Sequence, residues 1–429
     1  MEMLASQSHL AMKPSKGKLP FSVMVVIVCA LAFALILYAE DVKSLARSSM
    51  LKLKSCPAQY LAPAHTAKTP TVDEEEIDER DYDLEECDMV KGRWVFNRSR
   101  KPLYTEESCP YIDRQVSCHT NGRPDDDYRY WEWQPDNCVL PRFDAAVALE
   151  RLKGKRLMFV GDSLQRGQWM SMVCSLYSHI PPDQKSMKRG HSLSIFQAKE
   201  YNATIEFYWA PFLVESNSDI KVIGDPKKRI LRLDSISKHA QHWIGVDILV
   251  FNTYVWWMSG LKIKSLWGSF ANAEEGYEEL DAPIAYRIGL RTWANWVDST
   301  VNPNKTRVFF TTMSPTHMRS SDWGNDKGIR CYNETRPVLK RGYWGSGSDG
   351  RLMSVVGSIV KRMKVPVSVI NITQLSEHRI DGHTSVYTET HGKVLNDEQK
   401  ADPLHNADCI HWCLPGVPDT WNQILYSYL

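Results

Sequence analysis

The sequence lacks any large imbalance of charge. Its 52 Lys and Arg residues nearly balance its 51 Asp and Glu residues, which leaves a formal net charge of +1. Proteins that bind nucleic acid through its phosphates carry a clustered excess of basic residues, so we expect no nucleic-acid partner. The hydrophobic content of 43% is typical of a globular protein. A chain of 429 residues has room for one large domain or two ordinary ones.

Other common signals are also missing. The sequence contains no internal repeat and no low-complexity tract. It has no Gly-rich phosphate loop, so a nucleotide-type ligand would need another mode of binding. His317, His383 and His405 have no partner at a metal-ligand spacing. We therefore assign no metal and interpret these histidines as structural residues or as contacts in a cleft.

One long apolar run is present near the N-terminus. Residues 21–39 form 19 consecutive residues without a charge, close to the roughly 20 that a transmembrane helix needs. A cleaved signal peptide is the alternative, but its apolar region is shorter and no small-x-small cleavage site directly follows this run. We expect a cytosolic tail over residues 1–18 and a retained transmembrane signal-anchor over residues 19–39. Basic residues flank the run on both sides, so their charges do not decide its orientation.

Cysteines and glycosylation acceptors indicate the compartment. Eight of the ten cysteines fall in the globular part, and an even set in a non-cytosolic domain suggests a disulfide framework. These are Cys87, Cys109, Cys118, Cys138, Cys174, Cys331, Cys409 and Cys413. The Asn-x-Ser/Thr acceptors are Asn97, Asn202, Asn304, Asn333 and Asn371. Together with the anchor they predict a single-pass type II protein with its folded part in the secretory lumen.

The remaining chain divides into three parts. Residues 40–85 contain an acidic run and predict a flexible stem. Residues 86–143 combine short strands, turns and cysteines, which is typical of a small disulfide-stabilised subdomain. Residues 144–429 change to longer alternating helices and strands, and we expect the catalytic domain there.

That alternation predicts an α/β fold with a mostly parallel sheet covered by helices on both faces. The expected strands are residues 156–160, 247–251, 307–312 and 365–370, and the expected helices are 145–152, 165–178, 283–297 and 352–363. The helix over residues 165–178 reads as amphipathic. Ligands of such sheets bind at the carboxyl ends of the strands. We therefore expect Ser163, Asn252 and residues 314–317 to converge on one cleft.

The strand over residues 156–160 is followed by Gly161-Asp162-Ser163. A serine at a strand–helix junction meets free backbone N–H groups and the positive end of a helix dipole, which suits a nucleophile. This is not the Gly-x-Ser-x-Gly elbow of α/β-hydrolases, because Gln165 replaces the second glycine. A helix N-cap is the alternative role for this serine.

A serine nucleophile needs a base that is held by a third group. Asp408 and His411 supply both, because an acid and a histidine three residues apart can lie on one face of a helical turn. A surface Asp/His pair is the alternative. Cys409 and Cys413 flank the histidine, but their spacing is unlike the usual structural zinc patterns, so disulfides are favoured. Among the 15 tryptophans, those near these motifs are candidates for sugar stacking and the others for the core.

These motifs resemble the SGNH (GDSL-type) esterase superfamily and, more closely, the plant trichome birefringence-like proteins. The stretches that match are residues 161–169, the Asn-Thr-Tyr-Val-Trp-Trp of residues 252–257, and residues 408–422. The Cys-rich segment from residue 87 to 143 resembles that family's N-terminal domain. One departure is Gly167, where many members are expected to have Asn.

The resemblance implies an SGNH-like three-layer α/β/α fold and a Golgi polysaccharide O-acetyltransferase of the xylan-acetylating branch. Ser163 would attack an acetyl donor, with His411 as general base and Asp408 orienting it. The N–H groups of Ser163 and Gly161 and the Asn252 side chain would stabilise the oxyanion.

Further site and partner assignments accompany this reading. Asp162 belongs to the same site. Arg166 holds the substrate or supports the oxyanion site, and an ordinary salt bridge is the alternative. The implied disulfides are Cys87–Cys138, Cys109–Cys174, Cys118–Cys413 and Cys331–Cys409. The implied partners are xylan, the Golgi membrane, and a transporter that supplies the acetyl donor, which is acetyl-CoA or another acetyl carrier. No tightly bound cofactor is expected. The same triad would serve an esterase, so transfer rests on the resemblance, and a non-catalytic polysaccharide-binding protein is the third alternative.

Overall fold

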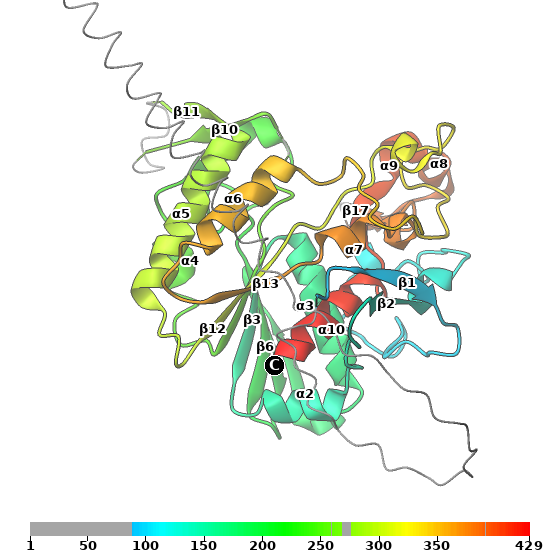
Figure 1. Ribbon diagram of the computed structural model, residues 1–429, viewed down its shortest axis with the longest axis horizontal. Coiled ribbons are helices and arrows are strands. Elements are labelled where there is room, and N and C mark those ends of the chain that lie inside the picture. Colours follow the sequence, from blue (N-terminus) through cyan, green and yellow to red (C-terminus); the bar gives the residue numbers. More distant parts are fainter. Residues whose placement is uncertain (1–87, 259, 268–275, 391) are drawn as a thin grey trace, which may run out of the picture. The chain divides into compact units, whose positions relative to one another are not determined.

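The fold was analysed in a computed structural model, which describes residues 88–258, 260–267, 276–390 and 392–429 (Figure 1). The expected tail, anchor and stem, and Cys87 of the expected Cys87–Cys138 pair, lie outside the described residues. Within the described ranges, no helix combines the length and apolarity that crossing a bilayer requires.

A seven-stranded sheet forms the centre of the fold, with the order β13-β12-β9-β3-β6-β5-β4. Five neighbouring strands are parallel, as expected, and β5 and β4 add an antiparallel edge that the sequence had not indicated. The bounds are β3 (Arg156–Gly161), β4 (Lys185–Arg189), β5 (Leu193–Ala198), β6 (Ala203–Trp209), β9 (Ile248–Phe251), β12 (Arg307–Thr311) and β13 (Val367–Ile370).

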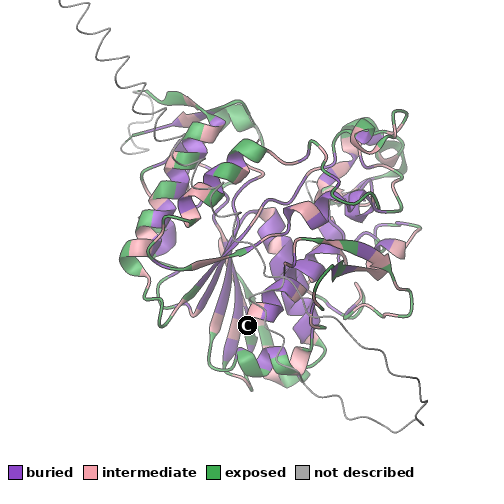
Figure 2. Ribbon diagram, in the orientation of Figure 1, coloured by how far each residue is buried: buried purple, intermediate pink, exposed green. Residues whose placement is uncertain are grey.

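Helices cover both faces of this sheet, which confirms the three-layer α/β/α prediction (Figure 1). One layer contains α2 (Ala145–Arg151), α3 (Ser163–Tyr177) and α10 (Val417–Tyr428), and the other contains α4 (Ser237–Ala240), α5 (Ala282–Thr300) and α6 (Gly350–Val360). Strand β3 shows why two layers are needed. Leu157 and Phe159 pack into one core, whereas Met158 and Val160 pack into the other, because successive side chains of a strand point to opposite faces. The buried residues accordingly lie on both sides of the sheet (Figure 2).

The expected helices and strands are found within a few residues of their predicted bounds, but one interpretation was wrong. Helix α3 is not amphipathic, since 12 of its 15 residues are buried. It lies between the sheet and α10, and its side chains, among them Trp169 and Met170, are part of the hydrophobic core. A helix that is covered on both sides needs no polar face. Ser163 is the first residue of α3, so the packing of this helix holds the serine backbone in place.

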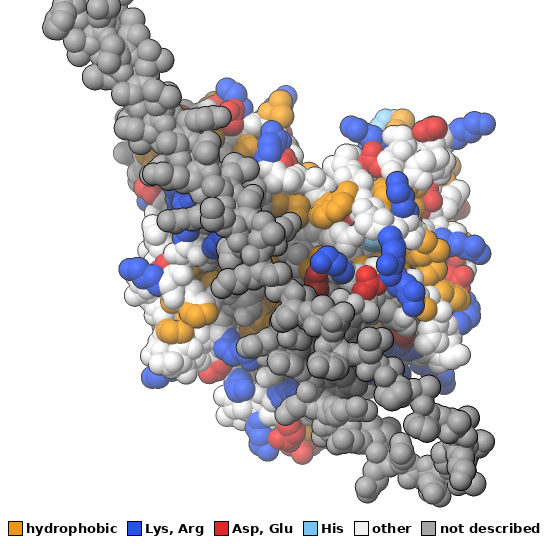
Figure 3. Space-filling model, viewed as in Figure 1, with side chains coloured by type: hydrophobic (Ala, Val, Ile, Leu, Met, Phe, Trp, Pro, Cys, Tyr) orange, Lys and Arg blue, Asp and Glu red, His pale blue; other side chains and the backbone are white. Residues whose placement is uncertain are grey.

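The other elements are small. The paired sheets are β1 (Gly92–Phe96) with β2 (Trp131–Pro135), β14 (His383–Ser385) with β17 (Asp408–Trp412), β15 (Glu389–Thr390) with β16 (Lys393–Val394), and the four-stranded β11-β10-β8-β7, with β7 (Glu215–Ser216), β8 (Ile230–Arg232), β10 (Lys262–Ser265) and β11 (Glu278–Asp281). Short helices are α7 (Thr373–Glu377), α8 (Asp397–Lys400), α9 (Pro403–Asn406), and the 3-10 turns η1 (Arg114–Val116), η2 (Asp127–Tyr130), η3 (Pro182–Gln184), η4 (Pro226–Lys228), η6 (Ser320–Trp323) and η7 (Ile380–Gly382). On the face shown in Figure 3, basic and acidic side chains of the described residues are interspersed, in line with the small net charge.

The Cys-rich segment packs directly against the α/β part. The Trp94 indole N–H donates to the Leu375 carbonyl at 2.8 Å, and the Tyr104 hydroxyl contacts the Asp419 carboxylate at 2.5 Å. Both bonds are largely buried, which makes the two parts one continuous core rather than separate bodies. Residues of this segment can therefore contribute to the site.

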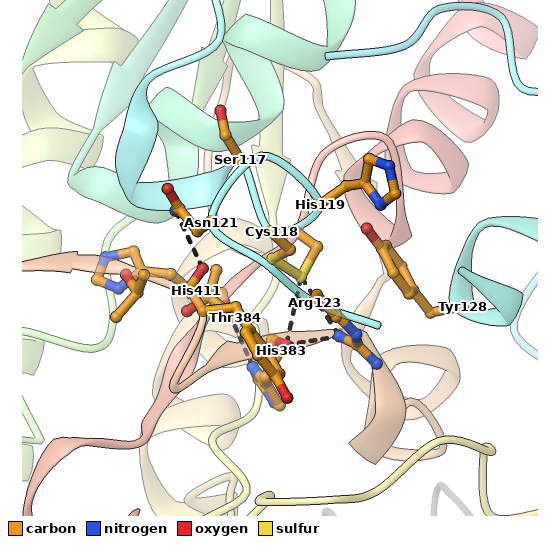
Figure 4. The surroundings of a disulfide bond; sticks show 12 residues. Ser117, Cys118, His119, Asn121, Arg123, Tyr128, His383, Thr384 and His411 are labelled. Atoms are coloured by element: carbon orange, nitrogen blue, oxygen red, sulfur yellow. Dashed lines mark hydrogen bonds between the residues drawn. A yellow bond between two sulfur atoms is a disulfide. The ribbon is translucent and has the colours of Figure 1, made fainter. Parts of the chain in front are cut away.

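Three of the four implied disulfides are present: Cys109–Cys174, Cys118–Cys413 and Cys331–Cys409. The last two flank His411 in the sequence, one on each side. Beside Cys118–Cys413, the Arg123 guanidinium donates to the His383 carbonyl at 3.0 Å (Figure 4). It also donates to the Asp381 carbonyl at 2.8 Å. The segment that carries His411 is thus fixed both covalently and by buried hydrogen bonds.

Removing this covalent link should inactivate the protein before it unfolds the sheet. The double variant Cys118→Ser/Cys413→Ser should lose about 2–5 kcal/mol of stability, as is usual for a native disulfide, because its two cysteines are 295 residues apart. Labelling of Ser163 by a fluorophosphonate should fall strongly at temperatures where circular dichroism still shows the native sheet. The matched control Cys109→Ser/Cys174→Ser should lose stability but keep more of the labelling. Equal labelling of the two double variants would contradict this role of Cys118–Cys413.

Candidate active site

The junction between β3 and α3 presents Ser163. Strand β3 ends at Gly161, and a Cβ at that position would lie 2.4 Å from the Asn252 carbonyl oxygen, so only glycine allows the two strand ends to approach this closely. Asp162 is the N-cap of α3, and its Oδ1 accepts from the Leu164 N–H at 2.9 Å. Ser163 is the first helical residue rather than the cap. None of the described residues accepts a hydrogen bond from its N–H, which stays available at the positive end of the helix.

Asp408 and His411 lie on strand β17, not on the helical turn that the sequence suggested. In a regular strand, residues three apart point to opposite faces. Here the register of β14 against β17 shifts, and the Asp408 carboxylate turns toward the residues that follow it in the chain. Its Oδ1 accepts from the N–H groups of Ile410 and His411, both at 3.0 Å. This local loop brings the carboxylate to the imidazole without a helix.

The three predicted residues form one hydrogen-bonded chain. The Ser163 Oγ lies 2.7 Å from His411 Nε2, and His411 Nδ1 lies 2.7 Å from Asp408 Oδ2. Burial alone would raise the pKa of Asp408, but the imidazole and the two backbone N–H donors outweigh it and hold that pKa below its usual range. An ionised Asp408 accepts a hydrogen bond from the Nδ1–H of His411, which keeps the proton on Nδ1 and leaves Nε2 free to take the serine proton. The geometry is that of an activated serine nucleophile.

A cleft of about 450 Å³ opens over Ser163 and His411. Trp209, at the carboxyl end of β6, and Trp256 form an aromatic wall, with ring centroids 5.5 Å apart and planes at 81°. The opposite rim is polar and includes Gln115 and Arg166. Aromatic faces beside polar groups are suited to a sugar, which has both apolar C–H surfaces and hydroxyls.

The expected role of Asn252 is not supported. Its Nδ2 donates to the carbonyls of Thr311 and Thr312, both at 3.0 Å, and the side chain is buried and does not line the cleft. The end of the adjacent strand β12 leaves those two carbonyls without sheet partners, and Asn252 satisfies them. Residues 314–317 do not line the cleft either, because Ser314 accepts from the Trp412 indole and His317 is buried. Ser163, Asn252 and residues 314–317 were expected to line one cleft. Ser163 lines it, and the other two strand ends do not.

Arg166 forms the salt bridge that the sequence left open, and it also lies in the cleft, where its role toward a substrate stays a prediction. It lines the cleft, its Nη1 forms a 3.3 Å salt bridge with Asp113, and its Nη2 donates to Gln115 Oε1 at 2.9 Å. Asp113 also binds Arg189 at 2.7 Å. The rim is thus a chain of ionic and amide contacts that starts in the N-terminal subdomain and reaches the catalytic helix.

Two buried histidines lie behind β17. His317 Nδ1 and His383 Nε2 share a hydrogen bond of 2.6 Å, and His383 Nδ1 donates to the His411 carbonyl at 3.0 Å. Burial lowers the pKa of His317 to about 4. These histidines are structural supports of the strand, and His405 is exposed beside Asp402. Cys409 and Cys413 are engaged in disulfides, so the alternative zinc site is wrong.

Sequence reasoning missed several cleft residues. Trp209 ends the alternating run Ala203–Trp209, which reads as a strand and could have been placed beside β3. Asp113, Gln115 and Arg189 come from irregular or edge segments, and their sequence contains no comparable signal. Only the packing of the Cys-rich segment onto α3 brings the first two to Ser163.

The five glycosylation acceptors differ in exposure. Asn202, Asn304 and Asn333 are exposed, whereas Asn97 and Asn371 are half-buried. Asn371 accepts from the Thr312 hydroxyl at 3.3 Å, and Thr373 of the same triplet is fully buried. The first three positions are accessible to a glycan in the folded protein, and their modification stays a prediction.

Comparisons with known proteins agree with this geometry. A family model described as a GDSL/SGNH-like acyl-esterase family found in Pmr5 and Cas1p matches residues 140–428, and one described as the PMR5 N-terminal domain matches residues 85–139. The chain is 58% identical to trichome birefringence-like 3 of Arabidopsis thaliana, over 97% of this chain and 99% of the relative. It is 53% identical to a rice (Oryza sativa subsp. japonica) protein named probable xylan O-acetyltransferase 8, over 98% and 99%. It is 51% identical to rice xylan O-acetyltransferase 6, over 80% and 62%.

The buried Asp162 should make stability depend on pH. Burial raises the pKa of Asp162 to about 6, so the folded state binds a proton more tightly than the unfolded state does. The contribution of Asp162 to the free energy of unfolding is therefore largest below about pH 4, and it is lost as the pH rises from about 4 to 6. In Asp162→Asn, which keeps an acceptor at the N-cap, this pH-dependent loss of stability should vanish. The variant should gain about 2–3 kcal/mol relative to wild type between pH 4 and pH 7.

Urea unfolding of both proteins at several pH values measures this difference. Asp144→Asn, at the exposed N-cap of α2, is the matched control. A difference between wild type and Asp162→Asn that is constant across pH 4–7 would show that burial of Asp162 does not affect its protonation.

Proposed function

The chain belongs to the GDSL/SGNH-like acyl-esterase family found in Pmr5 and Cas1p, and on this basis we propose that it is a polysaccharide O-acetyltransferase with xylan as its acceptor. The observation that carries the catalytic part is the chain from Ser163 through His411 to Asp408, with both links at 2.7 Å. Ser163 and His411 line the cleft. Xylan is supported by relatives named xylan O-acetyltransferases that align with nearly the whole chain.

The first half-reaction loads the serine. His411 Nε2 removes the proton from Ser163 Oγ, which attacks the acetyl carbonyl of the donor and forms a tetrahedral oxyanion. The N–H of Ser163 is positioned to donate to that oxyanion, and a donor of this kind typically contributes about 10²–10³ in rate. The intermediate collapses, the leaving group takes the proton from His411, and acetyl-Ser163 remains.

The second half-reaction transfers the acetyl group. A sugar hydroxyl enters beside His411, gives its proton to Nε2 and attacks the acetyl carbonyl. Collapse of the second tetrahedral intermediate breaks the bond to Ser163 Oγ, which takes the proton back from His411. Trp209 and Trp256 offer apolar faces for the C–H surfaces of the acceptor. Water in place of the sugar would make the same machinery an acetylesterase.

Donor and compartment belong to the same proposal. The donor is acetyl-CoA or another acetyl carrier, supplied by a transporter partner. The Golgi lumen is supported by the apolar run of residues 21–39, the three disulfides and the exposed acceptors Asn202, Asn304 and Asn333.

The catalytic proposal predicts an acetylated sugar that depends on Ser163. Purified protein from residue 85 onward, incubated with an acetyl donor and xylo-oligosaccharide, should form acetylated product. Ser163→Ala and His411→Ala should each lower the rate by about 10⁴-fold or more, since triad members act as a unit. Ser186→Ala, an exposed serine on β4, is the control. Donor hydrolysis that sugar does not change would identify an esterase, and binding without turnover a non-catalytic protein.

The topology proposal predicts that protease added to sealed microsomes should spare the folded part and remove only the N-terminal tail. Treatment with an endoglycosidase should then shift its mobility. A protein that is digested without detergent, or that sediments with the cytosol, would contradict the luminal assignment.

A further inference from the structure

Gln115 is the residue of the N-terminal subdomain that comes nearest to the catalytic base. It lies in the turn η1, lines the same cleft as Ser163 and His411, and is half-buried. Its backbone carbonyl accepts from the Thr388 hydroxyl at 2.9 Å, which fixes the turn against the body. The side chain therefore extends from a supported backbone toward the reacting atoms.

The contact between Gln115 and the imidazole is not an in-plane hydrogen bond. Nε2 of Gln115 lies 3.3 Å from His411 Nδ1 and 3.5 Å from Nε2, nearly the same distance from both. The in-plane positions of those nitrogens are already taken by Asp408 and Ser163. The amide must therefore lie against the ring face, and its N–H groups keep capacity to donate to another partner.

Arg166 determines which end of the amide meets the cleft. Its Nη2 donates to Gln115 Oε1 at 2.9 Å, and a guanidinium can only donate. The oxygen is thereby directed away from His411, and the NH2 group is directed toward it. The salt bridge from Arg166 to Asp113 holds the arginine in turn. The site thus contains a pre-oriented pair of N–H donors beside the general base.

We propose that Gln115 orients the acceptor sugar by donating a hydrogen bond to a hydroxyl next to the one that is acetylated. The inference rests on the proposed transferase function. The attacking hydroxyl must give its proton to His411 Nε2, so it enters within hydrogen-bonding distance of that nitrogen. On a pyranose, the neighbouring hydroxyl is then close to the same ring, and the Gln115 amide, 3.3 Å from that ring, is a donor within its reach. Water can occupy the first position but has no second hydroxyl for Gln115.

Gln115 is therefore a specificity-determining residue that favours transfer over hydrolysis. A neutral hydrogen bond to a bound hydroxyl is a modest interaction, but a site that leaves a polar group unpaired discriminates more strongly against a substrate without the matching group. Loss of the amide donors should lower the ratio of transfer to hydrolysis by roughly tenfold. It should leave formation of acetyl-Ser163 largely intact.

The test follows the fate of the acetyl-enzyme. Wild type, Gln115→Leu and Gln115→Glu are mixed with 4-nitrophenyl acetate, and mass spectrometry quantifies acetyl-Ser163 before and after xylotriose is added. Gln115→Leu removes the amide, and Gln115→Glu keeps the contact with Arg166 but removes the N–H donors. Both should show the lower ratio. Gln197→Leu, an exposed glutamine on β5, is the matched control and should behave as wild type.

Acceptors that lack one hydroxyl separate orientation of the sugar from support of His411. Methyl xyloside blocked at O-4 is compared with its 2-deoxy and 3-deoxy analogues. With the analogue that is still acetylated, wild type and Gln115→Leu should transfer equally, because the hydroxyl that Gln115 binds is gone. A defect of the same size with this analogue, an unchanged ratio with xylotriose, or failure of the variants to form acetyl-Ser163 would each overturn the role of Gln115.

Failure of the wild-type protein to form acetyl-Ser163 is a different result. It would refute the proposed function, and the inference about Gln115 would fall with it. A wild-type protein that forms acetyl-Ser163 and passes the acetyl group only to water would likewise refute transfer itself.

Discussion

The site depends on one constraint, the position of a short strand that is held from both sides. His411 reaches a serine 248 residues earlier in the chain, and nothing local to either residue brings them together. Cys409 ties the start of β17 to Cys331, and Cys413 ties its end to Cys118. Between these ties the His411 carbonyl accepts from His383. An imidazole attached to a free loop would sample many positions, and most of them would leave Ser163 without a base.

The nucleophile side relies on a different principle. Ser163 is held mainly by packing, because α3 is enclosed by the sheet and by α10 and begins at a fixed junction. The Cys109–Cys174 disulfide ties the far end of the same helix to the N-terminal subdomain. The cost is concentrated in Asp162, a buried carboxyl whose Oδ2 has no hydrogen-bond partner among the described residues. A buried polar atom without a partner is costly, because it has lost its hydrogen bonds to water and gained none. The two halves of the site are thus fixed differently: packing dominates around Ser163, whereas disulfides lie immediately on both sides of His411.

Much of the fold could be predicted from the sequence, because parallel strands and their helices carry strong periodic signals. The strand and helix around Ser163 are examples. The triad could also be predicted, because a serine nucleophile needs a base and Asp408 and His411 offer an acid and an imidazole at a short spacing. The exact geometry could not be predicted, since Asp408 reaches His411 through a β-strand irregularity and not through helical spacing.

The errors at the cleft have a similar origin. Asn252 occupies the expected sheet edge, but neighbouring carbonyls use its amide. Gln115 has no periodic context at all, and it reaches the cleft only through the packing of a separate subdomain. Local patterns therefore locate the nucleophile and its base, whereas the residues that surround a substrate depend on long-range packing.

The Cys118–Cys413 link has a consequence for the order of events during synthesis. Cys413 is close to the C-terminus, and 295 residues separate it from its partner. While the chain is still being made, all seven strands of the central sheet and Ser163 are synthesised before the base is. The nascent chain therefore has no complete site until residues 408–413 have been made and Cys413 has paired with Cys118. A chain that stopped before residue 408 would have a nucleophile with no base to activate it.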